Sequence, residues 1–141
     1  MAAPLLAAAA ACALALRGFP GGEPLAQVPL AQPEFALRYT HSVTLRPVES
    51  RYEIRNGRIV QTAEVFDEHG PGMATEPLPG ERFERDGARF VLSMRRPIER
   101  LIVSVQRLPA QKLVTGGDAI ELMRFGERAL EIAVDCAPEK R

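Results

Sequence analysis

The chain contains only two histidines, His41 and His69, so any catalytic base or imidazole metal ligand has to come from this pair. His69 lies in the segment 67–73, where two glycines and a proline make a tight loop in which backbone amides can approach a ligand. Together with nearby polar residues, this loop forms the candidate ligand- or partner-binding site: His41, Ser42, Glu49, His69, Gly70 and Gly72. A second interpretation stays open, in which His41 bonds a backbone group and holds a purely structural turn in place.

The same residues argue against catalysis. A triad of Ser42, His69 and Glu49 lacks the nucleophile-elbow pattern, and neighbours on one strand, such as His41 and Ser42, point to opposite faces. The sequence contains no zinc spacing, phosphate-cradling loop, dinucleotide fingerprint or EF-hand pattern. We therefore predict a protein that is not an enzyme and has no catalytic residue, cofactor or metal site.

Charge excludes one class of partner. The chain has 18 basic and 18 acidic residues and a formal net charge of zero, whereas a nucleic-acid-binding surface needs net or clustered positive charge. Arginine greatly outnumbers lysine, which is typical of a GC-rich genome. The pair Arg95-Arg96 remains an alternative anion contact.

The elements that position these residues follow a period of two. From Phe35 to Val43, apolar residues and His41 occupy one face, which is typical of a half-buried strand. Segments 100–107 and 128–135 alternate in the same way. The sequence therefore predicts an all-β domain, a single antiparallel β-sandwich or small barrel of about eight short strands.

Three glycine dipeptides indicate hairpins. Asn56-Gly57 places Ile54 opposite Ile59. Asp86-Gly87 predicts the pairs Phe83–Phe90 and Glu84–Arg89. Gly116-Gly117 predicts the pairs Leu113–Ile120 and Lys112–Glu121.

The amino terminus is typical of a targeting segment. Residues 2–16 form an uncharged run of about 22 Å as a helix, too short for the roughly 30 Å core of a bilayer. Ala13-Leu14-Ala15 and Pro24-Leu25-Ala26 resemble signal cleavage sites, although no basic residue precedes the run. A cleaved signal, a retained anchor and a lipidated Cys12 all stay open. With the leader removed, Cys136 is the only thiol, so we expect no intramolecular disulfide.

These features predict four segments: a signal peptide or anchor over 1–26, a linker over 27–33, the β-sandwich over 34–136 and a tail over 137–141. The stretch Tyr39-Thr40-His41-Ser42-Val43, the loop 69–73 and the stretch 111–117 resemble a bacterial family known as domain of unknown function 1850. That resemblance implies an exported, periplasmic protein, in some cases anchored to the inner membrane, encoded beside TRAP-type transporters of the TAXI class.

Two functions follow from the resemblance and the residues together. The first is an exported, non-enzymatic accessory protein that contacts the membrane or solute-binding subunits of a TRAP-type uptake system, with the membrane close to its amino terminus. The second is a periplasmic module that binds a small organic anion near His41 and the 69–73 loop. No nucleic-acid partner is expected.

Overall fold

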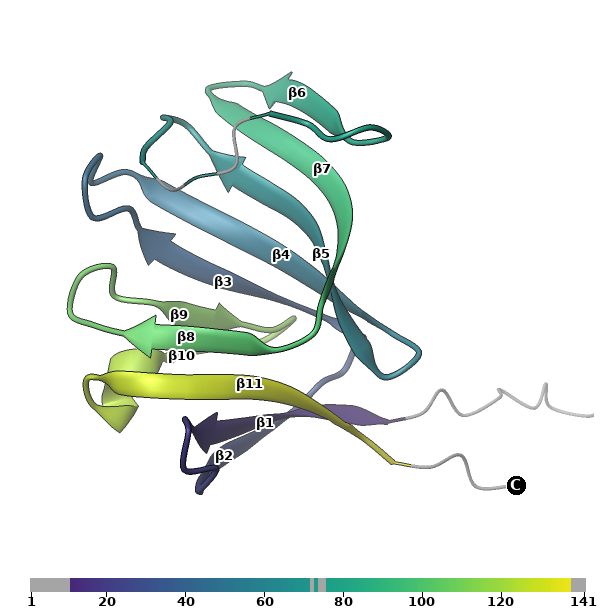
Figure 1. The fold of residues 1–141 in the computed structure, drawn as a ribbon, viewed down its shortest axis with the longest axis vertical. Helices are drawn as coiled ribbons and strands as arrows, with labels where there is room; N and C mark the ends of the chain where they lie inside the picture. Colours follow the sequence, from purple (N-terminus) through teal and green to yellow (C-terminus); the bar gives the residue numbers. More distant parts are fainter. Residues whose placement is uncertain (1–10, 72, 74–75, 138–141) are drawn as a thin grey trace, which may run out of the picture.

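The computed structural model describes residues 11–71, 73 and 76–137, and these form two antiparallel β-sheets (Figure 1). The smaller sheet has the order β2-β1-β11-β8 and contains β1 (Cys12–Gly18), β2 (Pro24–Pro29), β8 (Leu101–Val105) and β11 (Arg128–Cys136). The larger sheet has the order β10-β9-β3-β4-β5-β7-β6. Its strands are β3 (Glu34–Thr40), β4 (Pro47–Arg55), β5 (Arg58–Phe66), β6 (Arg82–Asp86), β7 (Arg89–Ile98), β9 (Lys112–Val114) and β10 (Ala119–Glu121). The predicted all-β sandwich is confirmed, with eleven strands in the described residues instead of about eight.

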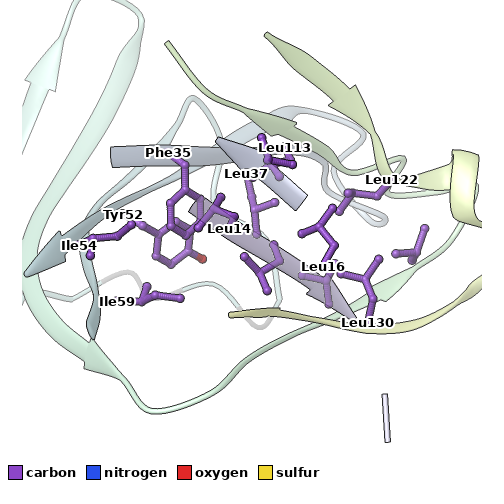
Figure 2. Packing of buried hydrophobic residues seen from close by; sticks show 14 residues of the cluster. Leu14, Leu16, Phe35, Leu37, Tyr52, Ile54, Ile59, Leu113, Leu122 and Leu130 are labelled. Atoms are coloured by element: carbon purple, nitrogen blue, oxygen red, sulfur yellow. The ribbon is translucent and has the colours of Figure 1, made fainter. Parts of the chain in front are cut away.

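The core forms where the two sheets face each other, because alternate residues of each strand point into the space between them. Figure 2 shows leucines of β1 and β11 packing against aromatic and aliphatic side chains of β3, β4 and β5. Phe35 and Tyr52 stack with ring centroids 5.0 Å apart, at an interplanar angle of 15°. Five leucines of the core have no exposed surface: Leu14, Leu16, Leu113, Leu122 and Leu130.

Two of the three predicted hairpins have the expected register. Ile54 pairs with Ile59, and both loop residues have positive φ, 52° at Asn56 and 73° at Gly57, as a type I′ turn requires. Ile120 pairs with Leu113, and Glu121 with Lys112, across the Gly116-Gly117 turn. A 3-10 helix over Leu122–Phe125 follows this hairpin.

The register predicted for the Asp86-Gly87 hairpin is wrong by one residue. Asp86 pairs with Arg89 and Phe83 with Leu92, so the two-residue loop is Gly87-Ala88. Gly87 has a φ of 64° as the first loop residue, which fits a type II′ turn. Phe83 and Phe90 are therefore diagonal neighbours whose rings still stack at 5.4 Å, and the predicted Glu84–Arg89 pair does not form.

The domain start predicted near Glu34 leaves out residues 12–18 and 24–29, which form β1 and β2 in the structure. β1 lies between β2 and β11, and β2 occupies part of the predicted linker. Cleavage after Ala15 would remove the buried Leu14, and cleavage after Ala26 would remove all of β1. An apolar strand inside a sheet has the same composition as a signal segment, so the sequence of this stretch fits both. Residues 1–10 and 138–141 lie outside the described residues.

Cys12 and Cys136 form a disulfide, contrary to the expectation from the sequence. They are directly opposite each other at the end of the β1–β11 pair, which brings together residues 124 positions apart. In the described part of the chain, no helix is long and apolar enough to cross a membrane.

Candidate functional site

His41 follows the last residue of β3 and links three backbone segments. Its Nε2–H donates to the carbonyl oxygen of Pro71 at 2.9 Å. Its Nδ1 accepts hydrogen bonds from the backbone N–H groups of Val43 at 3.1 Å and Thr44 at 3.3 Å. A carbonyl can only accept and an amide N–H can only donate, so these contacts assign the hydrogen to Nε2. Both ring nitrogens are thus used within the chain, and only 8% of the residue is exposed.

The loop after β5 is fastened close to His41 by two further contacts. The Nε–H of Arg46 is shared between the two carboxylate oxygens of Asp67, at 3.0 and 3.1 Å, and Nη2 of Arg46 donates to the same carboxylate. The imidazole packs directly over Gly70, where an added Cβ would lie 2.5 Å from Cε1 of His41. A glycine is needed at this position because the ring occupies the space of a side chain.

The other predicted site residues do not join His41 at one centre. Ser42 is exposed in the turn after β3, and Val43, expected on the buried face, is 65% exposed. Val48 points into the core, and successive residues of a strand point to opposite faces. Glu49 therefore lies on the outer face of the larger sheet, away from His41. Gly72 lies outside the described residues.

His69 lies in an aromatic cluster beside the loop. Its ring is 4.9 Å from that of Phe66 and 5.9 Å from that of Phe90, and it is nearly parallel to the latter, at 10°. Phe83 on β6 completes the cluster and is 37% exposed. The three phenylalanines belong to β5, β6 and β7, and Figure 1 shows these strands extending past the smaller sheet. We find His69 in an aromatic stack, separate from the hydrogen bonds of His41.

A buried carboxylate two strands from His41 was not expected from the sequence. Glu64 on β5 is 8% exposed and accepts hydrogen bonds from three side chains. Ser50 donates at 2.9 Å, Tyr39 at 3.2 Å and Gln61 at 2.7 Å. Three strands supply these groups, and Tyr39 is two residues before His41, near the end of β3.

Electrostatics at this carboxylate is dominated by burial. Loss of water raises the pKa of Glu64 above its usual value, while the three hydrogen bonds and the charge of Arg96 oppose that rise. Burial, with the nearby charge of Glu64, also raises the pKa of Tyr39. The Glu64 carboxyl group can exchange a proton, but both of its oxygens already accept hydrogen bonds from side chains of the protein. We interpret it as a polar element that stabilises the larger sheet.

Arg96 links the end of the long β5–β6 loop to β7. Its guanidinium donates to both oxygens of Glu81, at 2.8 and 2.6 Å. These bonds, with the Leu78 N–H, lower the pKa of Glu81 to about 2. The loop is therefore fastened at its beginning by Arg46 and at its end by Arg96.

The outer face of the larger sheet carries a shallow depression of about 350 Å³. Cations of three strands line it: Arg38, Arg89 and Lys112. Glu49 is also there, held by Arg38 and Arg51, each at 2.6 Å. Burial acts to raise the pKa of Glu49, but the bonds from both arginines prevail and lower it. Within the described residues, no cluster of three or more His, Cys, Asp or Glu side chains could hold a metal ion.

Comparison with known families gives one match. Residues 35–122, which run from β3 to the start of the 3-10 helix, match the model of a domain of unknown function, DUF1850. The chain belongs to the DUF1850 family. The match includes the His41 contacts, the Glu64 hydrogen bonds and the depression lined by Arg38, Arg89 and Lys112, called the basic depression below. Strands β1, β2 and β11 lie outside the match. No match was found among curated proteins or solved structures.

Proposed function

We propose that this DUF1850 protein is an exported, non-enzymatic accessory domain that works outside the cytoplasm beside a TRAP-type (TAXI) solute uptake system. Its partner would be the membrane component or the solute-binding subunit of that system. The observation that carries the proposal is the disulfide between Cys12 and Cys136. Structural disulfides form and persist in oxidising compartments such as the bacterial periplasm and are rare in the cytosol.

A non-enzymatic role is supported by the way the polar side chains are used. His41 bonds to backbone through both ring nitrogens. Glu64 accepts from three neighbours and is enclosed. A general base needs a free acceptor within reach of a substrate proton, and each of these groups is already engaged within the chain. A pocket for an organic anion at His41 would likewise need a free ring nitrogen.

The compartment is tested by the oxidation state of the two cysteines in intact cells. Trapping free thiols with a maleimide of known mass, before lysis, should leave the wild-type chain unlabelled. The matched control Cys136→Ser should take one label, at Cys12. A wild-type chain that takes two labels from growing cells would contradict export to an oxidising compartment.

The partner is tested by cross-linking the tagged full chain in the bacterium and purifying it from solubilised membranes. We expect mass spectrometry to identify a TRAP membrane or solute-binding subunit. The same tag on an unrelated exported β-sandwich should not recover these subunits. Recovery of neither subunit with the DUF1850 chain would refute the transporter association, even if export is confirmed.

A further inference from the structure

Two loops at one end of the sandwich hold large apolar side chains in water. Val43 and Leu45, in the β3–β4 turn, are 65% and 63% exposed, and Leu108, in the β8–β9 loop, is 43% exposed. The loops are neighbours, because the N–H of Thr40 donates to the carbonyl oxygen of Pro109 at 2.9 Å. Figure 1 shows both loops at the left of the molecule.

Leu45 is the most informative of these residues because its backbone is strained. Its φ is 58°, in the left-handed region that glycine adopts freely and branched or bulky side chains avoid. Ala110, in the neighbouring loop, has a φ of 55°. An exposed leucine gains no burial in return for this strain. Its side chain is therefore not explained by the fold, and strained positions of this kind concentrate at binding surfaces.

The basic depression adjoins these loops. Ala110 of the β8–β9 loop lines it, together with Thr40, next to Arg38 and Lys112. Arg89 makes no ion pair within the described residues, and Lys112 lies 3.7 Å from an exposed Glu121. Arg107, in the β8–β9 loop itself, has 88% of its side chain exposed and lies 3.6 Å from the exposed Glu127. Exposed cations thus flank the apolar tips of the loops.

We propose that this end of the domain docks on an anionic phospholipid bilayer. Val43, Leu45 and Leu108 would enter the boundary between headgroups and acyl chains. Arg89 and Lys112 would contact lipid phosphates. Apolar residues on separate loop tips, with cations set back behind them, fit a headgroup layer better than the flat face of a protein partner.

The geometry separates this contact from anchoring through the amino terminus. The start of β1 and the end of β11, where the disulfide lies, are at the opposite end of the sandwich from the two loops (Figure 1). Docking through the loops holds both of these strand ends away from the bilayer. The proposal stands independently of any transporter partner, since the isolated chain should bind lipid alone.

Co-sedimentation of the purified full chain with vesicles tests the apolar contact. Vesicles of phosphatidylglycerol mixed with phosphatidylcholine should bind the chain, and vesicles of phosphatidylcholine alone should bind it weakly. Leu45→Gly removes the side chain and relaxes the backbone, so its melting temperature should not fall, while its vesicle affinity should drop about tenfold. Unchanged vesicle binding by Leu45→Gly would place the contact elsewhere and overturn the proposal.

A second pair of variants tests the cations. Arg89→Gln combined with Lys112→Gln should weaken binding to anionic vesicles and flatten its dependence on salt. Arg58→Gln, in the β4–β5 hairpin at the other end, is the matched control and should bind as wild type. If inorganic phosphate raises the melting temperature through Arg89 and Lys112 while no vesicle binds, the depression holds a soluble anion and the docking proposal is wrong.

Discussion

The imidazole of His41 and the carbonyl of Pro71 are joined by a 2.9 Å hydrogen bond across 30 residues of sequence. This bond connects the end of β3 to the loop after β5, and Gly70 gives the ring the space to make it. Of the two roles that the sequence left open for His41, the backbone contacts favour the structural one.

We predict that His41→Ala lowers the free energy of unfolding by about 1–3 kcal/mol, because two N–H groups and one carbonyl lose their partner. The control Ser42→Ala, one residue along in the same turn, should change it by less than about 0.5 kcal/mol. Urea denaturation of the three proteins measures both values. A stable His41→Ala protein that has lost a binding activity would instead indicate a site role.

Gly70→Ala should cost about 1–3 kcal/mol, since its Cβ would overlap the ring of His41. The double variant with His41→Ala should be less destabilised than the sum of the two single changes, because the overlap disappears with the ring. Strict additivity in this double-mutant cycle would show that the two residues do not contact each other.

Glu64→Gln should remove a dependence of stability on pH. Burial raises the pKa of Glu64, so the folded state binds the proton more tightly than the unfolded state does. The resulting stability is present below the ordinary value of 4.5 and is lost as pH rises through the folded-state pKa. Relative to wild type, Glu64→Gln should therefore gain stability as pH increases from 4.5.

Denaturant midpoints across this pH range, with the exposed Glu84→Gln as a control, measure the effect. A difference between Glu64→Gln and wild type that stays constant with pH would contradict the raised pKa.

Gly57→Val should cost about 1–3 kcal/mol, because valine avoids the φ of 73° found there. Gly116→Val is the matched change in another two-residue hairpin loop. Gly116 has no positive φ, and an added Cβ there meets no atom within 4 Å. We expect it to cost clearly less. Thermal melts of both variants measure the two losses of stability. Equal losses would show that backbone strain at Gly57 does not cause the destabilisation.

Cys136→Ser should lower stability by about 2–5 kcal/mol, because the disulfide closes a loop spanning most of the chain. A reducing agent should bring the wild type to the same midpoint and leave the variant unchanged. A wild type that is insensitive to reduction would mean that the bond contributes little.

The hairpins show what local sequence can predict. Asn56-Gly57 and Gly116-Gly117 set their registers because a two-residue turn leaves a single pairing of the flanking strands. The dipeptide Asp86-Gly87 also permits a turn one residue later, with Gly87 first, and the chain uses that one. The strand at β1 was missed because Leu14 and Leu16 are accompanied by small apolar residues on both faces, so no alternation is visible.

The Glu64 contacts show what local sequence hides. Continuing the Asn56-Gly57 register would place Ala63 opposite Ser50. A bulge in β5 between Gln61 and Ala63 shifts the pairing, so Glu64 takes that position. The one sequence signal for a buried polar group was Ser50, a polar residue on the inward face of β4. Its pairing with Glu64 could not be predicted, because no residue type in the sequence indicates the bulge. The His41–Pro71 contact likewise joins the β3–β4 loop to the β5–β6 loop. These loops lie close together only because the sheet brings the ends of β3 and β5 to the same side.

The position of β1 also sets the order of events during synthesis. Its strand lies between β2, which follows it within a few residues, and β11, which is made last. Until residues 128–136 leave the ribosome, β1 and β2 are an isolated hairpin, which is marginally stable in water. The smaller sheet can therefore close only after β11 has been translated, whereas every strand of the larger sheet precedes β11 in the chain. Pairing of segments this far apart in the sequence is slow, so we expect the Cys12–Cys136 bond to form late in folding.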